Sequence, residues 1–293
     1  MHLVTFSDDA GERIGAWTAD RREVVDLAAT GSNVPRTMLD LIRAGAPGLA
    51  AARAALSAPR RALASVRLHA PIPRPAKNIF CVGKNYKEHA REFHGSGFDA
   101  TAKEAIPEAP IVFTKAPTAV VAGGAAILAS LDDTGSTDYE GELAVVIGKG
   151  GRGIGKAHAY AHVFGYTIIN DVTSRTLQRR HAQWFIGKSI DGFCPMGPAI
   201  VTADEIPDVS ALRLITRVNG EVRQDASVAD LIFDIPTLIE TLSKRMTLEP
   251  GDLIATGTCA GVGIGFTPPK FLKPGDRVAV TIEPIGTLEN PVA

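Results

Sequence analysis

An acidic segment that runs directly into an apolar strand places the strongest constraint on this chain. It extends from Asp138 to Gly148 and begins with the residues Asp-Tyr-Glu-Gly-Glu. Because successive side chains of a strand point to opposite faces, Glu140 and Glu142 are predicted to share one face, while Gly141 leaves the other face open. Carboxylates this close repel each other, so they either face water or share a positive partner, most commonly a divalent cation. The alternative is the polar beginning of an ordinary edge strand.

The composition indicates a globular protein that acts on a small molecule. The chain has 293 residues, of which 45% are hydrophobic, and a formal net charge of −1. It contains no basic run, so neither nucleic acid nor an anionic membrane is an expected partner. Its cysteines, Cys81, Cys194 and Cys259, are odd in number and widely spaced. This argues against a disulfide framework and a thiolate zinc site. Without a signal peptide or a membrane span, we expect a soluble cytoplasmic protein.

Residues 1–70 are predicted to form a small N-terminal α+β support domain. Short strands are expected at 3–6, 13–17 and 23–27, followed by helices at 37–44 and 48–63. Three prolines within residues 71–75 exclude regular structure and mark the boundary. Residues 71–293 are then the catalytic or binding domain.

A histidine and a glutamate on one predicted helix form the first candidate catalytic pair. A short apolar strand over 78–83 leads into a polar, helix-compatible segment over 84–93, in which His89 and Glu92 are three residues apart. They would share a helix face, and a carboxylate beside an imidazole raises its basicity for taking a proton from water. The alternative is an incidental pair on a solvated helix. The polar stretch that continues to Ala109 is predicted to be a mobile lid.

A second apolar strand, over 164–169, ends at Asn170 and Asp171. Asp171 is either the N-cap of a helix predicted over 172–181 or a third carboxylate beside Glu140 and Glu142. Arg175 and Gln178 are three residues apart on that helix and can face the same site. Lys188 is either solvated or a charge partner of these carboxylates.

The remaining segments favour strands and turns over a regular strand–helix alternation. Strands are predicted at 110–113, 119–128, 199–201, 214–218, 253–255 and 277–283, with a turn at 193–198, a hairpin at Asn219-Gly220 and a helix at 235–243. The loop over 256–263 has N–H groups that can hold a carboxylate. We find no repeat of fixed period, and a strand-rich α+β class is predicted.

The glycine-rich segment Gly150–Lys156 imitates a phosphate-binding loop. It fits the glycine and lysine spacing and lies between an apolar strand and a helix predicted over 157–163. Ala157, however, stands where a Ser or Thr hydroxyl would bind magnesium. The alternative to a nucleotide-binding module is a flexible connection.

Several of these segments occur along the chain in the same order as the sequence motifs of a known family. They are Gly83-Lys84-Asn85-Tyr86 with His89 and Glu92, Asp138 to Leu143, Phe164-Gly165-Tyr166 with Asn170, Asp171, Arg175 and Gln178, Gly187-Lys188-Ser189 with Cys194 to Pro198, and Thr256-Gly257-Thr258 with Gly261-Val262-Gly263. Together they cover about residues 75–265, and the chain is on this basis identified as resembling the fumarylacetoacetate hydrolase family.

The resemblance implies a catalytic domain built as a mixed β-sandwich roll, usually dimeric, with a magnesium, manganese or calcium ion held by three carboxylates. Its ligands would be Glu140, Glu142 and Asp171, with Asp138 outside the set. His89 and Glu92 resemble the family's water-activating pair. Three further residues resemble substrate-site residues: Lys188 stabilises charge, Gln178 contacts the substrate, and Thr258 binds its carboxylate; Arg175 is expected beside them. Lys84, Ile190 and Cys259 depart from common family residues and leave the substrate open.

The function expected from these features is metal-dependent hydrolysis of a carbon–carbon bond in an acylpyruvate-type 2-oxo acid, in the catabolism of aromatic compounds or sugar acids. Three carboxylates leave a hard cation with open positions that a 2-oxo acid can fill, and the cation stabilises the developing enolate. Isomerisation or decarboxylation of 2-hydroxyhepta-2,4-diene-1,7-dioate or oxaloacetate, and ureidoglycolate lyase activity, are alternatives on the same site. The alternatives of another class are the nucleotide-binding module and a non-catalytic scaffold.

Overall fold

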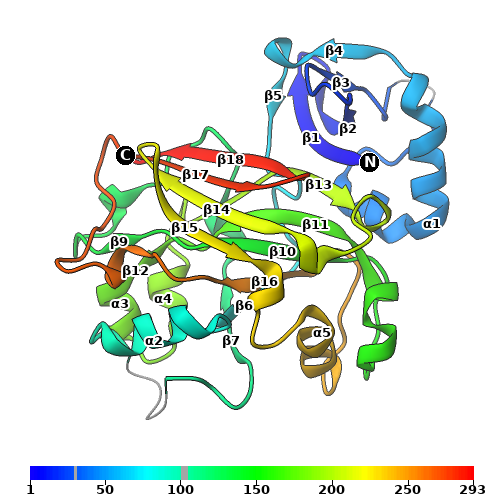
Figure 1. The fold of residues 1–293 in the computed structure, drawn as a ribbon. Helices are drawn as coiled ribbons and strands as arrows, with labels where there is room; N and C mark the ends of the chain where they lie inside the picture. Colours follow the sequence, from blue (N-terminus) through cyan, green and yellow to red (C-terminus); the bar gives the residue numbers. More distant parts are fainter. Residues whose placement is uncertain (30–31, 100–104) are drawn as a thin grey trace.

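The computed structural model describes residues 1–29, 32–99 and 105–293. Figure 1 shows a strand-rich α+β fold in which β1–β5 and α1 lie at one end of the molecule, and α2, α3 and α4 gather at the far end of the central strands. The predicted α+β class, with its mixed β-sandwich roll, is confirmed. The division at residue 70 stays a prediction, since β1 in the N-terminal segment hydrogen-bonds to β13.

The helices and strands have the following bounds. The α-helices are α1 (Met38–Ala54), α2 (Lys87–Gly95), α3 (Arg175–Arg180), α4 (Phe185–Lys188) and α5 (Ile235–Ser243). The strands are β1 (His2–Asp8), β2 (Gly11–Trp17), β3 (Glu23–Val25), β4 (Arg60–Ala62), β5 (Arg67–Leu68), β6 (Ile79–Gly83), β7 (Ile111–Lys115), β8 (Val120–Val121), β9 (Thr137–Asp138), β10 (Gly141–Ile147), β11 (Val163–Asn170), β12 (Thr173–Ser174), β13 (Cys194–Thr202), β14 (Arg213–Val218), β15 (Glu221–Ser227), β16 (Leu253–Thr258), β17 (Arg277–Ile282) and β18 (Gly286–Pro291). Short 3₁₀ helices, among them η1 (Ala55–Ser57) and η5 (Lys156–His162), connect several of them.

The larger sheet places β10 between β11 and β16. Its main path follows the order β4-β3-β2-β1-β13-β11-β10-β16-β6-β7. β10 is antiparallel to both neighbours, and Glu142 pairs with Ile169 on one side and Thr258 on the other. Every residue of β10 is buried. The strand that carries the acidic motif is therefore central, and the alternative of an ordinary edge strand is wrong.

The smaller sheet, in the order β15-β14-β17-β18, packs against β10, β11 and β13. A β-carbon on Gly141 would collide with Thr216 Oγ1 of β14 and lie 3.0 Å from Val280 Cγ1 of β17. The face that we expected to be open at Gly141 is thus filled by this sheet. Glycine is required there because the two layers approach too closely for a side chain.

Two predicted elements of the N-terminal half differ from the structure. The helix expected over 48–63 belongs to α1, which is interrupted at Gly45 and ends at Ala54, and residues 60–62 instead pair with β3 as β4. The strand expected over 119–128 is reduced to β8, since Gly124 adopts a φ of 80° in the turn that follows. Tertiary pairing outweighs local propensity in the first case, and a turn conformation that favours glycine interrupts the second.

Three further differences lie close to the carboxylate strands. Residues 173–174 form β12. Ser174 is the N-cap of α3, and its hydroxyl accepts a hydrogen bond from the N–H of Leu177, so Asp171 is not the N-cap of this helix. The turn expected over 193–198 and the start of the loop expected over 256–263 both continue strands, β13 and β16. Of the predicted lid, residues 100–104 lie outside the described residues.

Candidate functional site

Three carboxylates meet where β10 begins and β11 ends. Glu140 directly precedes β10, Glu142 is its second residue, and Asp171 directly follows β11. One carboxylate oxygen from each lies within 4.8 Å of the others, and all three residues are buried. The backbone N–H of Asp171 donates to the carbonyl of Glu140 at 2.8 Å, which extends the strand pairing and fixes this spacing. The predicted metal ligands therefore form one cluster.

The chemistry of this cluster fits a hard divalent cation. Each residue contributes only carboxylate oxygens, which magnesium, manganese and calcium prefer. Asp171 Oδ1 is buried and accepts no hydrogen bond of good geometry from the described residues, although Lys115 Nζ lies 2.7 Å away. The Lys115 ammonium group compensates the charge of this oxygen, and the oxygen has no directed donor that would compete with a metal ion. Glu140, Glu142 and Asp171 can thus hold such an ion.

Buried cationic side chains surround the carboxylates. Lys188 Nζ at the end of α4 lies 2.7 Å from both Glu140 Oε2 and Asp171 Oδ2. Arg175 at the start of α3 places Nη1 2.6 Å from Glu140 Oε1. Lys115 at the end of β7 contacts Asp171 and donates to the carbonyls of Val172 and Lys188. Glu140 and Asp171 therefore each have an opposite charge at contact distance, whereas Glu142 accepts the backbone N–H of Gly257 at 2.8 Å.

The same neighbours set the protonation of the cluster. Burial raises the pKa of Glu140, but the attraction of Lys188 and Arg175 outweighs it and lowers that pKa below its usual range. Burial, followed by repulsion from Asp171 and Glu140, holds the pKa of Glu142 well above its usual range. Burial alone would lower the pKa of Lys188, yet Asp171 and Glu140 raise it. Two nearby carboxylates with opposite shifts are typical of a functional site.

The predicted catalytic pair forms on α2. His89 Nδ1 lies 3.1 Å from Glu92 Oε2, and the second oxygen, Oε1, accepts the N–H of Gly261 at 3.0 Å. Both side chains are largely shielded, with exposed fractions of 5% and 15%. The ring of His89 also stacks on Phe93 at 6.2 Å. Glu92 is thus fixed on one side by the loop after β16, and it holds the imidazole on the other.

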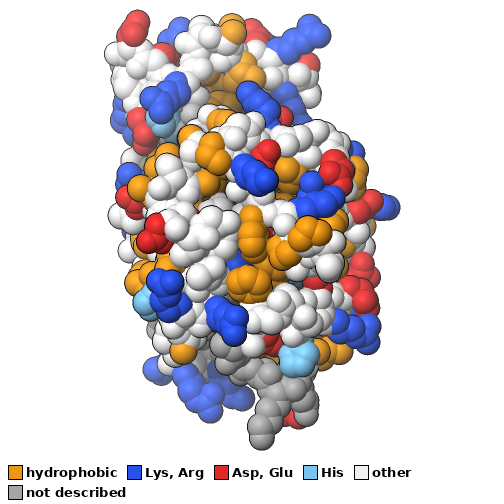
Figure 2. Space-filling view, turned by 90° about the vertical axis from the view of Figure 1, so that its left-hand side faces the viewer, with side chains coloured by type: hydrophobic (Ala, Val, Ile, Leu, Met, Phe, Trp, Pro, Cys, Tyr) orange, Lys and Arg blue, Asp and Glu red, His pale blue; other side chains and the backbone are white. Residues whose placement is uncertain are grey.

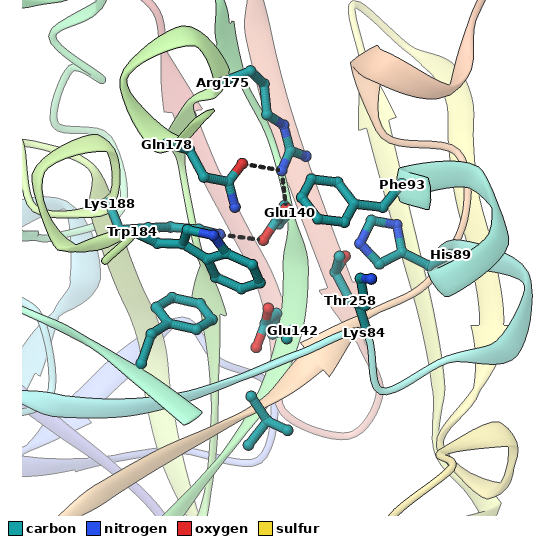
Figure 3. A pocket seen from close by; sticks show the side chains of 13 residues that line it. Lys84, His89, Phe93, Glu140, Glu142, Arg175, Gln178, Trp184, Lys188 and Thr258 are labelled. Atoms are coloured by element: carbon teal, nitrogen blue, oxygen red, sulfur yellow. Dashed lines mark hydrogen bonds and ion pairs between the residues drawn. The ribbon is translucent and has the colours of Figure 1, made fainter. Parts of the chain in front are cut away.

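One small pocket joins the carboxylates to this pair (Figure 3). It is lined by Val82, Gly83, Lys84, His89, Phe93, Phe113, Glu140, Glu142, Arg175, Gln178, Trp184, Lys188 and Thr258. In Figure 3, His89 and Phe93 project from α2 towards Glu140, while Lys188 and Trp184 approach from the opposite side. Trp184 packs edge-on against Phe93 and Phe113, at 5.8 and 5.2 Å between ring centres. Charged groups and an aromatic wall therefore face one space.

The candidate substrate residues line this pocket but differ in whether their hydrogen-bonding groups remain available to a ligand. Gln178 Oε1 accepts from Arg175 Nη1 at 3.2 Å, and the buried Arg175 Nη2 has no hydrogen-bond partner among the described residues. The Thr258 hydroxyl, in contrast, donates to the Gly141 carbonyl at 2.9 Å and accepts from Gln224 Nε2 at 2.7 Å. Arg175 keeps a donor for a ligand, while the Thr258 hydroxyl is committed to the two sheets.

Carboxylates of the protein itself occupy the N–H groups that we expected to hold a ligand carboxylate in 256–263. Gly257 N–H donates to Glu142, Gly261 N–H to Glu92 and Gly263 N–H to Asp138, at 2.8, 3.0 and 2.6 Å. The loop therefore orients residues of the site.

Two charged residues at the site, Lys115 and Asp138, have contacts that the sequence did not predict. Lys115 follows the strand predicted over 110–113 and received no role there; the pairing of β7 with β6 brings its amine to 2.7 Å from Asp171 Oδ1. Asp138 was left outside the ligand set, and its oxygens accept hydrogen bonds from Arg175, Gly263 and Ile264. A lysine at the end of an apolar strand is a sequence signal that could have indicated Lys115. The partners of Lys115 and of Asp138, however, come from distant segments of the chain.

The glycine-rich segment does not form a phosphate cradle from the groups that the structure describes there. The N–H groups of Gly148 and Lys149 donate to the carbonyl of His162, and that of Gly153 donates to Ser243. The segment leads into the 3₁₀ helix η5 rather than an α-helix. Within the segment, the N–H groups of Gly151 and Ile154 also donate, to the Leu248 carbonyl at 2.9 Å and to the Ser243 hydroxyl at 3.0 Å. Donors that are already satisfied cannot hold a phosphate, which removes the support for a nucleotide-binding module. In the described ranges, no helix combines the length and apolarity that crossing a membrane requires.

Comparison with known proteins identifies close relatives of the whole arrangement. Oxaloacetate tautomerase YisK of Bacillus subtilis is 59% identical over 230 residues, which cover 78% of this chain and 74% of that protein. A fumarylacetoacetate hydrolase from Exiguobacterium antarcticum is 43% identical, with a TM-score of 0.84 over 100% of this chain and 99% of its own. Maleylpyruvate hydrolase from Sphingobium sp. SYK-6, solved with manganese(II) and pyruvate, is 31% identical, with a TM-score of 0.80 over 100% and 99% of the two chains.

The family assignment follows from these likenesses and from a direct family match. Residues 78–293 match the model of the fumarylacetoacetate hydrolase C-terminal domain. This range includes α2, Glu140, Glu142 and Lys188, which contribute to the pocket, and Asp171, which contacts Lys188. The chain therefore belongs to the fumarylacetoacetate hydrolase family.

Proposed function

We propose that this protein is a divalent-metal-dependent enzyme that interconverts the enol and keto forms of a small 2-oxo diacid of the oxaloacetate type. The observation that supports it most is that Glu140, Glu142, Lys188 and His89 line one pocket together. Trp184 and Phe113 close one side, which favours a four-carbon acid over a long acylpyruvate. The likeness to an oxaloacetate tautomerase supports the same choice.

In this proposal Glu140, Glu142 and Asp171 hold a magnesium, manganese or calcium ion. When bound, such an ion supplies positive charge that favours the enolate form of a 2-oxo acid. The unpartnered Nη2 of Arg175 and the amide of Gln178 orient the substrate, because a guanidinium group suits a carboxylate. Thr258 contributes the floor of the pocket.

His89 is the proton carrier of the reaction. Its Nδ1 is held by Glu92, so Nε2 takes the proton from the carbon next to the keto group and then gives this proton to the enolate oxygen, which regenerates the neutral imidazole. Lys188 faces the same pocket and balances the charge that develops on that oxygen. Keto and enol forms have the same composition, so no water is consumed.

The experiment follows the enol absorbance of freshly dissolved oxaloacetate. Manganese-loaded protein should accelerate its decay, and chelation should abolish the acceleration. A coupled assay for pyruvate detects decarboxylation separately. Unchanged decay with manganese-loaded protein would contradict tautomerisation.

Hydrolysis of an acylpyruvate is the second candidate. Glu92 orients His89 towards the pocket, and such a pair can also activate a water for attack on a carbonyl carbon. The structural likeness to a maleylpyruvate hydrolase supports this chemistry. A panel of acylpyruvates, diene-diacids and ureidoglycolate, with products identified by mass, separates hydrolase, isomerase and lyase activities.

A small acid substrate and a homodimer complete the proposal. Over the described residues of the face in Figure 2, basic and acidic side chains are interspersed, a pattern that does not favour nucleic acid as a partner.

Three exposed apolar side chains lie on β7 and α4, which pack against each other. They are Val112 on the edge strand β7, and Phe185 and Ile186 on α4, and each is at least 38% exposed. A second copy of the chain would bury these exposed apolar side chains, so their position is consistent with the proposed dimer. Light scattering in solution tests it.

A further inference from the structure

The loop Gly261–Gly265 donates backbone hydrogen bonds to two carboxylates from distant parts of the chain. Asp138 Oδ1 accepts the N–H of Gly263 at 2.6 Å, and Oδ2 accepts that of Ile264 at 3.1 Å. Glu92 Oε1 accepts the N–H of Gly261 at 3.0 Å. The loop is therefore a bridge between Asp138, which is fully buried beside the metal ligands, and Glu92, which holds the catalytic imidazole.

The packing around this bridge leaves little room for either carboxylate to move alone. A β-carbon on Gly263 would lie 2.5 Å from Asp138 Oδ1, and one on Gly265 would collide with the Glu92 carboxylate. The Tyr139 hydroxyl donates to the carbonyl of Gly261 at 2.8 Å. The carbonyl and the N–H of Gly261 are thus both anchored, so a shift of the loop must displace Glu92.

Asp138 also fixes the guanidinium group in the pocket. Its Oδ2 accepts from Arg175 Nε at 2.9 Å, and Arg175 Nη1 lies 2.6 Å from Glu140 Oε1. Figure 3 shows Arg175 reaching down to Glu140, with Gln178 beside it. One carboxylate outside the ligand cluster therefore contacts both the loop that holds Glu92 and the side chain that contacts Glu140.

We propose that Asp138 is a positioning residue that couples the loop Gly261–Gly265 to the catalytic pair. It holds the loop so that Gly261 N–H orients Glu92, and Glu92 in turn orients His89. At the same time it directs Arg175 into the pocket. This inference rests on the proposed function for its kinetic test, and hydrogen exchange provides a test that needs no substrate.

The central experiment is a double-mutant cycle between Asp138→Asn and Glu92→Gln. Asparagine keeps the size of Asp138 but replaces one acceptor oxygen with an NH₂ group, so it cannot accept from Arg175 and both loop N–H groups together. The single variant D138N should lose about tenfold or more in kcat and keep manganese affinity within about threefold. In the E92Q background the same change should cost clearly less than in the native protein, because the part of its effect that passes through Glu92 is already lost.

Asp252→Asn is the matched control. Asp252 is also a buried aspartate that accepts a backbone N–H, from Glu249 at 2.8 Å, and a cationic donor, Lys77 Nζ at 2.8 Å. It lies in the turn before β16 and touches neither the loop nor α2. D252N should lower thermal stability, and any effect on kcat should add to that of E92Q.

Additive effects of D138N and E92Q on kcat would overturn the proposal. So would a manganese affinity lowered as far as in Glu140→Gln, because Asp138 would then act through the ligands. If D138N does not fold, Tyr139→Phe removes only the hydroxyl that holds Gly261, and it should show the same coupling to E92Q.

Hydrogen exchange separates this inference from the proposed function. Amides in 261–265 and in α2 should exchange about tenfold faster in D138N, or in Y139F, than in the native protein and in D252N, because local opening loses its restraint. Unchanged exchange would contradict the positioning role. Absence of tautomerase activity in the native protein, with the exchange result intact, would contradict only the proposed function.

Discussion

Lys188 Nζ lies 2.7 Å from Glu140 Oε2, with both side chains buried. The same amine contacts Asp171 at an equal distance, so one cation lies between two of the three carboxylates. A divalent ion on these carboxylates would share their charge with Lys188. The amine and the ion are therefore expected to substitute for each other in part.

Lys188→Met is predicted to make the fold depend on metal. Removal of one partner from a buried ion pair costs about 3–5 kcal/mol, because the other charge is left without compensation. Manganese should restore much of this loss, so the rise in Tm on adding manganese should be larger than in the native protein. Equal rises in both proteins, measured by calorimetry, would contradict the substitution.

Glu142→Gln is predicted to affect the metal-free and metal-bound proteins in opposite directions. The pKa of Glu142 is raised by burial and by its neighbouring carboxylates, so a neutral amide should leave the metal-free Tm unchanged or higher. Loss of one ligand should weaken manganese binding by about tenfold or more. Titration calorimetry measures the affinity. Glu240→Gln, a change outside the site on α5, is the control and should change neither quantity.

His89→Gln is predicted to separate metal binding from turnover. His89 contacts Glu92 and lies outside the ligand cluster, so manganese affinity should be retained. Loss of the proton carrier should lower kcat about 100-fold or more. Loss of manganese binding in this variant would show that His89 is a ligand.

The hydrogen bonds around Asp132 predict a stability that falls with acid. Burial raises the pKa of Asp132, but the hydroxyls of Thr134 and Ser174 outweigh it and lower that pKa below its usual value. A depressed folded-state pKa stabilises the protein above the unfolded value, near about 4, and the contribution disappears as pH falls below it. The difference in free energy of unfolding between native protein and Asp132→Asn should therefore shrink below about pH 4. A constant difference in denaturant titrations would exclude this origin.

Local patterns in the sequence predicted the elements of the site better than the connections between them. The apolar runs of β6, β11 and β14 and the hairpin at Asn219-Gly220 are confirmed, because alternation and turn residues are local properties. The cluster of Glu140, Glu142 and Asp171 was expected because the order of motifs resembles a family. Lys115 could not be predicted, because it reaches Asp171 only through the register of β7 on β6. The same holds for Thr258, whose hydroxyl is bound by Gln224 from the second sheet.

Gly141 links the choice of ion to the thickness of the hydrophobic core. Its missing side chain lets Thr216 and Val280 of the second sheet lie against the residue that joins the two glutamates, so we expect the packing of the sheets to influence the spacing of the ligands. Magnesium requires oxygens at roughly 2.0–2.1 Å and calcium accepts roughly 2.3–2.6 Å. A larger residue at position 280, which contributes no ligand atom, is then expected to shift the preference between small and large ions. Selectivity for the radius of the cation is in this sense a property of core packing.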